Sequence, residues 1–236
     1  MDKKFFIAIL SHKKSNFREG QRKYLLENNR DRFIIYYFIG DPALQEKYVV
    51  DEDNNVVYLN IPDNYESLPL KTYGAVQFAF ENFSDQIFGL LKTDDDIELD
   101  LDKIQTYLNE YKDVPYCGIT TKITDPYNLS RWHMGKCESE ILNSTPQRVP
   151  LAEYCAGGGY YLNLNSMEKL IGSRDLYGGM IFEDATTGFV LNSHGIYPKT
   201  VDLTQHGFKW EGISPPVPYR PVPSSKNNTG GPLGLR

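Results

Sequence analysis

Three consecutive aspartates, Asp94 to Asp96, directly follow the apolar run 87–93. Open α/β sheets place their ligand crevice at the carboxyl ends of strands, so these side chains would face a bound molecule. In an extended chain Asp94 and Asp96 point to one face and Asp95 to the other. Their repulsion would be relieved by Mn²⁺ or Mg²⁺ bridging to a diphosphate, whereas the alternative is a solvated acidic turn that caps the next helix.

A second acidic pair, Glu183 and Asp184, opens a segment of helical pattern. One carboxylate would cap the helix while the other faces a cleft, where burial raises its pKa and lets it remove a proton from a hydroxyl. The competing interpretation is that both carboxylates only complement the helix dipole. Taken alone, the pair favours this second interpretation.

The glycine run 157–159 precedes a predicted strand at 160–164. Glycines let a backbone approach a sugar face or a diphosphate closely, although a flexible turn explains them equally well. His206 is one of four histidines and a candidate metal ligand, whereas a lone histidine is more often structural.

Short apolar runs alternate with segments of helical period, which favours strands joined by crossover helices. The pattern predicts strands at 5–10, 33–38, 56–59, 87–93, 116–121 and 160–164. It also predicts a first helix that Ser15 or Asn16 caps and that ends near 28, and further helices at 67–83, 101–111, 166–171 and 184–193. Ser67 and Asp100 are the expected caps of two helices. The predicted fold class is α/β, a mixed and mainly parallel sheet flanked by helices in a single domain.

The composition argues against several classes of protein. The net charge of −6 and pI near 5.3 argue against a broad basic surface for nucleic acid. Apolar runs fall short of the roughly 20 residues of a membrane span, so no transmembrane segment is expected. Three cysteines without a C-x-x-C spacing indicate neither a disulfide framework nor a zinc site. We expect one domain over 1–213 and an extended or disordered Pro/Gly-rich tail over 214–236.

Six elements recur in the order of a known family. They are Arg18-x-x-x-Arg22, Phe38-Ile39-Gly40, Tyr65 to Thr72, Lys92-x-Asp94-Asp95-Asp96, Tyr154 to Leu162, and Glu183-Asp184-x-x-x-Gly188. Together they resemble the β-1,3-galactosyltransferase and Fringe group, glycosyltransferase family 31, which has a GT-A-type fold. Any one element is weak evidence, but chance does not readily explain six elements in this order.

The resemblance implies a metal-dependent, inverting transfer of galactose, N-acetylglucosamine or glucose from a UDP-sugar to a glycan or glycoconjugate hydroxyl, with a β-1,3 linkage. The residues it implicates are Asp184 as general base with Glu183 as rival; Asp94, Asp96 and His206 as ligands of Mn²⁺ or Mg²⁺; and Arg18, Arg22, Lys71, Asp94, Asp95, Gly158 and Gly159 in donor binding.

Two alternatives remain open. A nucleotidyltransferase would use the same acidic triplet, and a non-catalytic carbohydrate-binding protein would fit the 13% aromatic content with its 17 tyrosines. Because the first strand begins near residue 5, we expect a cytoplasmic protein of viral or microbial origin, unless the chain is a lumenal domain trimmed of its anchor. The oligomeric state is not predicted.

Overall fold

The computed structural model describes residues 3–15, 18–29, 31–125 and 127–210. Eight strands form its main sheet: β1 (Lys4–Leu10), β2 (Phe33–Gly40), β3 (Tyr48–Asp51), β4 (Val56–Leu59), β5 (Ile87–Asp94), β7 (Tyr116–Ile123), β10 (Ala152–Asn163) and β11 (Lys199–Thr200). Their order is β11-β7-β10-β5-β1-β2-β4-β3, and β3 and β10 run opposite to the other strands. The predicted mixed, mainly parallel sheet is confirmed.

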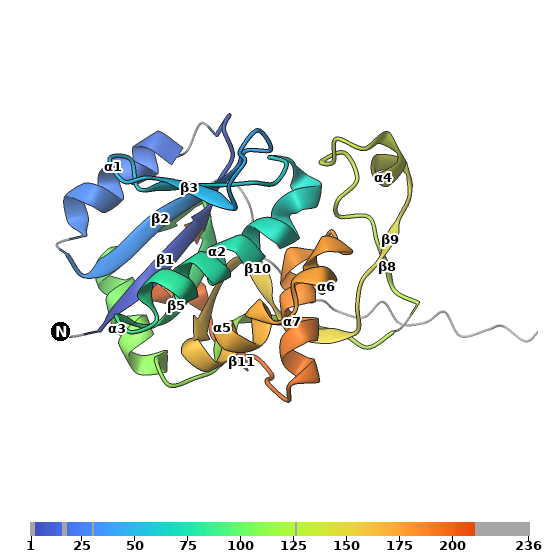
Figure 1. The fold of residues 1–236 in the computed structure, drawn as a ribbon. Coiled ribbons are helices and arrows are strands. Elements are labelled where there is room, and N and C mark those ends of the chain that lie inside the picture. Colours follow the sequence, from blue (N-terminus) through green and yellow to red (C-terminus); the bar gives the residue numbers. More distant parts are fainter. Residues whose placement is uncertain (1–2, 16–17, 30, 126, 211–236) are drawn as a thin grey trace, which may run out of the picture.

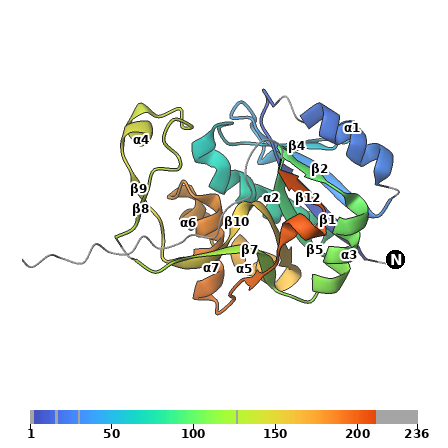
Figure 2. The same ribbon diagram turned by 180° about the vertical axis from the view of Figure 1, so that it is seen from behind.

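Helices cover both faces of this sheet (Figures 1 and 2). They are α1 (Arg18–Asn28), α2 (Leu68–Phe83), α3 (Leu101–Tyr111), α5 (Leu164–Ile171), α6 (Arg174–Gly178) and α7 (Glu183–Ser193). Side chains of α2, α5, α6 and α7 share one buried cluster with the sheet, and those of α1 and α3 share the other. The two apolar layers explain why the central strands are hydrophobic on both faces.

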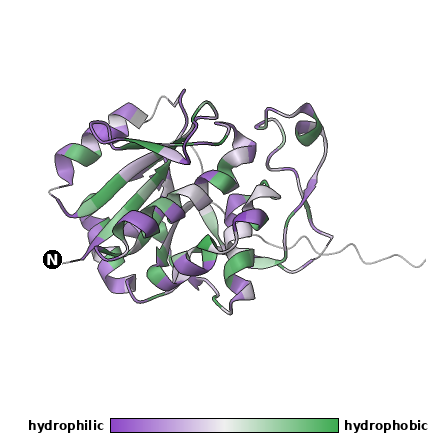
Figure 3. Cartoon of the chain, in the orientation of Figure 1, coloured by the Kyte–Doolittle hydropathy of each residue, from purple (hydrophilic) through white to green (hydrophobic). Residues whose placement is uncertain are grey.

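The central strands bring the acidic residues to one edge of the sheet. Every residue of 5–10 in β1 is at most 3% exposed, and hydrophobic stretches run along these strands in Figure 3. β1 pairs in parallel with β2 and β5, and its last residue, Leu10, lies opposite Asp94. Parallel strands end at the same edge, so the aspartates emerge beside the chain that leaves β1.

The long strand β10 corrects the sequence interpretation of the glycine run. Glycines 157–159 lie inside this strand, which begins at Ala152 rather than at 160, and its pairing with β7 shifts register between Cys155 and Tyr160. Because glycine has a low strand propensity, the run itself carries no sequence signal of a strand. Packing explains its position, since a side chain on Gly159 would come within 2.5 Å of Phe208.

A lobe of residues 124–151, with Pro126 outside the described residues, connects β7 to β10 and projects from the body in Figure 1. It contains β8 (Leu129–Ser130), α4 (Glu140–Ser144) and β9 (Gln147–Arg148), and β8 pairs with β9. The sequence analysis predicted no element here. Elements of two to five residues carry no periodic signal, so the pattern could not reveal them.

Short elements complete the fold: β6 (Ile97–Leu99), β12 (Phe208–Trp210) and the 3₁₀ turns η1 (Tyr65–Ser67) and η2 (Leu203–His206). Asp100 caps α3 as predicted, accepting a bond from the Lys103 N–H at 3.3 Å. Ser67 occupies the N-cap position of α2 without a side-chain cap bond, and Asn64 instead caps the preceding turn.

The predicted tail, 214–236, falls outside the described residues. Within the described ranges, no helix combines the length and hydrophobicity that crossing a bilayer requires.

Candidate active site

The acidic turn between β5 and β6 holds three carboxylates in different surroundings. Asp94 ends the strand and accepts a 2.7 Å bond from the Lys92 ammonium. Asp95 accepts a 2.5 Å bond from the Ser11 hydroxyl, beyond the end of β1. Asp95 and Asp96 form a turn, so strict alternation of side chains ends at Asp94. Burial, followed by the charges of its two neighbours, raises the pKa of Asp96.

Lys92 links this turn to the second acidic pair, a role that the sequence analysis did not assign. Its ammonium is buried and contacts Asp94, the Glu183 carboxylate at 2.9 Å and the carbonyl oxygen of Gly157. Burial alone would lower the pKa of Lys92, but the two carboxylates raise it and keep the ammonium charged. A lysine two positions before Asp94 shares its face of the strand, and that spacing was the available signal.

Glu183 is fully partnered. Besides Lys92, its carboxylate accepts bonds from the Thr72 hydroxyl at 3.2 Å and the Tyr160 hydroxyl at 3.0 Å. The side chain is buried, and burial raises its pKa to about 7 against the attraction of Lys92. These partners fix the carboxylate in place and leave it little freedom to receive a substrate proton.

Asp184 has a different environment although it is the next residue. Its carboxylate accepts backbone N–H bonds from Gly157 at 3.2 Å and from Ala185 at 2.7 Å, and no cation contacts it directly among the described residues. Burial raises its pKa. Its charge also contributes to the raised pKa values of Tyr65 and Tyr154, after their own burial, so both phenol groups lie nearby. A half-buried carboxylate of raised pKa is suited to accept a proton.

Lys71 is internal rather than open to a donor. Its ammonium is 2% exposed and donates to the carbonyl of Ser11 at 2.7 Å and to Asp63 at 2.9 Å. Asp63 also accepts the N–H groups of Lys13 and Gly40. The arrangement ties α2 to the chain leaving β1 and β2, so Lys71 supports the edge of the sheet where the acidic turn lies.

The two arginines predicted for donor binding are positioned by α1. Arg22 donates to the side chain of Asn54, in the turn that joins β3 to β4. Arg18 begins α1, and its side chain lies outside the described residues. Arg22 is thus bonded to the turn between β3 and β4, and the donor role of both arginines stays a prediction.

The glycines predicted to approach the donor are bordered by protein atoms. A side chain on Gly158 would come within 2.9 Å of the Trp210 indole nitrogen, and one on Gly159 would meet Phe208. Phe208 and Trp210 stack on one another with ring centroids 6.1 Å apart. Close packing of β12 on the strand is thus a sufficient reason for these two glycines.

His206 does not join the two aspartates. Its ring lies against α3, with centroids 5.1 Å from Tyr107 and 6.0 Å from Tyr111. Over the described ranges, no three side chains of His, Cys, Asp and Glu are close enough to hold a metal ion. Asp94, Asp96 and His206 are therefore not gathered as a set of three ligands.

A cavity of about 510 Å³ opens beside the acidic turn. It lies between α1 and β6, and Gln21, Tyr24, Asp96, Ile97, Leu99 and Lys209 are among its lining residues. Its volume is within the range of small-molecule sites. The cavity is on the α1 side of the sheet and Asp184 is on the α7 side, so the carboxyl ends of the strands lie between them.

Comparison with known proteins identifies the family. The family model described as galactosyltransferase matches residues 17–202. The chain belongs to this family. The predicted family and the predicted enzyme class, a glycosyltransferase, are confirmed for this galactosyltransferase-family protein.

Two solved structures are similar to this family member at low identity. One is a glycosyltransferase involved in glycosylation of the major capsid of PBCV-1, at 12% identity, covering 85% of this chain and 82% of that chain, with a TM-score of 0.46. The other is 4-diphosphocytidyl-2C-methyl-D-erythritol synthase from Anaerococcus prevotii, at 11% identity, covering 84% and 86%, with a TM-score of 0.45. The search of curated proteins found no match.

The carboxylates of the acidic turn in this family member are suitable ligands for a hard divalent cation. Mg²⁺ is commonly bound by one or two carboxylates together with substrate phosphates rather than by an all-protein cage. Asp94 and Asp96 supply two carboxylates, and the raised pKa of Asp96 reflects burial and the charges of Asp94 and Asp95, whose repulsion a bound cation would reduce. The aspartates fit Mn²⁺ or Mg²⁺ without a third protein ligand.

Proposed function

We propose that this protein is a metal-dependent, inverting glycosyltransferase that uses a UDP-sugar of the galactose, N-acetylglucosamine or glucose type and forms a β-1,3 linkage on a glycan or glycoconjugate. One observation carries the proposal. The Lys92 ammonium contacts both Asp94 and Glu183, which joins the acidic turn to the beginning of α7. A diphosphate site and a proton acceptor thereby become parts of one site.

The donor would occupy the edge where the strands end. The cavity between α1 and β6 offers Tyr24, Ile97 and Leu99 to a nucleoside, and Asp96 lines it. A divalent cation on Asp94 and Asp96, when bound, acts as a Lewis acid that stabilises the departing diphosphate oxygens. A donor crossing the sheet edge from this cavity directs its sugar toward α7, as expected of ligands outside the carboxyl ends of strands.

Asp184 is the proposed general base. As a carboxylate it accepts the proton of the acceptor hydroxyl, whose oxygen then attacks the anomeric carbon opposite the leaving diphosphate. This single displacement inverts the anomeric configuration, and no nucleophilic side chain is needed. The N–H groups of Gly157 and Ala185 orient the carboxylate while each oxygen keeps a free lone pair.

Glu183 and Lys92 would position these groups. The Glu183 carboxylate and the Lys92 ammonium are bonded to each other and are held by Thr72, Tyr160, Asp94 and the carbonyl oxygen of Gly157. An ammonium at this point also offsets the charge of the surrounding carboxylates, which would otherwise repel a diphosphate. We therefore assign the base to Asp184 rather than to its rival, Glu183.

The test is a donor panel with purified protein. We expect Mn²⁺-dependent release of nucleoside diphosphate from one UDP-sugar, and an acceptor product whose anomeric proton coupling reports a β linkage. Asp85→Asn is a matched control, because Asp85 is exposed and precedes the other end of β5.

Three results would contradict the proposal. Full turnover in both Asp96→Ala and Asp184→Asn would contradict the roles of Asp96 as metal ligand and Asp184 as general base. Release of pyrophosphate from a nucleoside triphosphate, without transfer from any UDP-sugar, would favour a nucleotidyltransferase. Binding of a glycan unaffected by EDTA and without turnover would indicate a carbohydrate-binding protein instead.

A further inference from the structure

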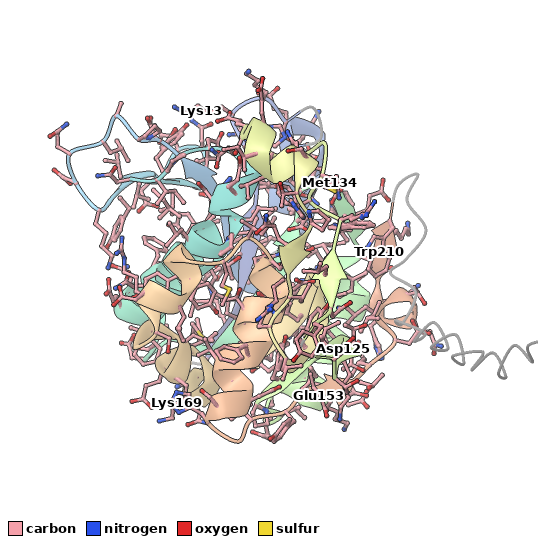
Figure 4. The ribbon with its side chains drawn as sticks, turned by 90° about the vertical axis from the view of Figure 1, so that its right-hand side faces the viewer. Lys13, Asp125, Met134, Glu153, Lys169 and Trp210 are labelled. Carbon is pink, nitrogen blue, oxygen red and sulfur yellow. The ribbon has the colours of Figure 1, made fainter. Side chains whose placement is uncertain are left out.

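The lobe of residues 124–151 is attached beside the second acidic pair. On one side the Ser139 N–H donates to Glu66 at 2.8 Å, and the Asn64 amide donates to Glu138 at 3.1 Å. Glu66 and Asn64 belong to the η1 turn and its cap. The view in Figure 4 looks onto this lobe, where Met134 is labelled.

A second attachment reaches the beginning of α7. The His133 ring packs edge-on against Phe182 with centroids 5.5 Å apart, and Phe182 is the N-cap residue directly before Glu183. Val149 of the lobe shares a buried cluster with Phe182 and Ala185. The lobe therefore borders the proposed base from both η1 and α7.

One cation in the lobe stands between two aromatic rings. The Lys136 ammonium is 3.7 Å from the centroid of the Trp132 ring and 5.6 Å from that of Tyr65. Within the described ranges its ammonium forms no ion pair with a carboxylate. The residue as a whole is exposed, but partial desolvation of the ammonium lowers the pKa of Lys136. Aromatic faces attract the ammonium, but an anion near it would recover more of its lost hydration.

The two rings lead from the solvent to the proposed base. Trp132 is 68% exposed, an uncommon condition for so large an apolar side chain. Tyr65, at the inner end, is half-buried near Asp184 and Glu183, whose charges add to burial in raising its pKa. A saccharide with one sugar at Asp184 would extend along Tyr65 toward Trp132.

We propose that Trp132, Lys136 and Tyr65 form an acceptor subsite for a saccharide that carries an anionic group, either a carboxylate or a phosphate. Lys136 binds the anion, and the faces of Trp132 and Tyr65 contact the sugar rings. This proposal rests on the proposed function, since it names the acceptor class of that site. In a chain of net charge −6, long-range charge repels anions, so local recognition must supply the preference.

The experiment measures binding to the full chain by calorimetry with four disaccharides. They end in glucuronic acid, in its methyl ester, in glucose and in glucose 6-phosphate. The ester removes the charge and keeps the shape, and the phosphate distinguishes the two sources of anion. We expect the acid or the phosphate to bind at least about tenfold tighter than the ester and glucose, as for a charge-assisted bond.

Three variants locate the effect. Lys136→Gln should abolish the preference for the anion, and Trp132→Ala should weaken all four saccharides by a similar factor. Ile141→Ala, which alters a 75% exposed residue of the same lobe, should change nothing. Lys136 and Trp132 are both exposed, so these substitutions should not disturb folding, and melting curves check this.

Equal binding of acid, phosphate, ester and glucose would overturn the inference, as would an anion preference that survives Lys136→Gln. Hydrolysis of the UDP-sugar without an acceptor separates this failure from that of the proposed function. Ile141→Ala, which changes a lobe residue outside the proposed subsite, should hydrolyse donor like the wild type. If no donor is turned over but saccharide binding still depends on Trp132 and Lys136, the proposed function fails and the subsite stands.

Discussion

Two neighbouring residues, Glu183 and Asp184, meet opposite surroundings. Glu183 is buried and bonded to Lys92, Thr72 and Tyr160, whereas Asp184 is half-buried and, among the described residues, is bonded only to backbone N–H groups. The acidic turn repeats the difference, because Asp94 contacts Lys92 while Asp96 has no cation in direct contact among the described residues. Glu183, whose two oxygens are both bonded by protein groups, holds the site together. A carboxylate oxygen without such a partner in the part of the chain that the structure describes, as on Asp96 or the second oxygen of Asp94, is available for a proton or a metal ion.

The largest effect expected from this difference is on catalysis. Asp184→Asn should lower kcat/KM by about 10²- to 10⁴-fold, the usual contribution of a general base, with little change in stability. The asparagine keeps the size of the side chain and can still accept one backbone bond. Diphosphate release and melting curves measure the two quantities, and a normal rate in this variant would end the distinction between the two carboxylates.

The buried ion pair between Lys92 and Glu183 should contribute to the stability of the fold. Lys92→Met leaves Glu183 buried without its cation, which typically costs about 3–5 kcal/mol of unfolding free energy. The cost should shrink at pH 5 relative to pH 8, because a carboxyl of raised pKa becomes neutral as the pH falls.

Chemical denaturation at the two pH values measures this cost. The matched control is Lys122→Met, which breaks the exposed ion pair with Glu153 and should cost about 1 kcal/mol or less. Equal losses in the two variants would show that the buried pair does not support the site.

Metal dependence tests the open carboxylate of the turn. Asp96→Asn should reduce turnover by about a hundredfold or more, since a Lewis acid contributes several kcal/mol to a transition state. EDTA should reduce the wild type to a similar level and leave the variant nearly unaffected. Turnover of the wild type that is indifferent to EDTA would contradict the assignment.

The smallest effect is on the pH profile. Asp184 must be deprotonated to act as base, and burial raises its pKa. As the pH falls through that pKa, kcat/KM should fall up to tenfold per pH unit, and this limb should lie above the range of an ordinary aspartate. The residual activity of Asp184→Asn should lack the limb, and its persistence would assign the ionisation to another group.

The predicted strands and helices that the structure confirms are those with strong local sequence patterns. The apolar runs of β1, β2 and β5 and the helix capped by Asp100 were readable because burial on both faces and capping leave signals within a few residues. The lobe and β6 left none, because their elements are short and depend on distant partners. The position of the acidic turn at a strand end was predictable for the same reason as the strand itself.

The sequence by itself determined that aspartates follow a buried strand and that an acidic pair begins a helix, because both are local patterns. Only the tertiary structure decided which carboxylates are held and which are free. Glu183 bonds to Lys92, which is 91 positions away in the sequence, and to Thr72, which is 111 positions away. His206 packs against the tyrosines of α3 instead of approaching the aspartates. Periodicity constrains neighbours along the chain, whereas the partners of a buried charge are set by how the strands and helices pack.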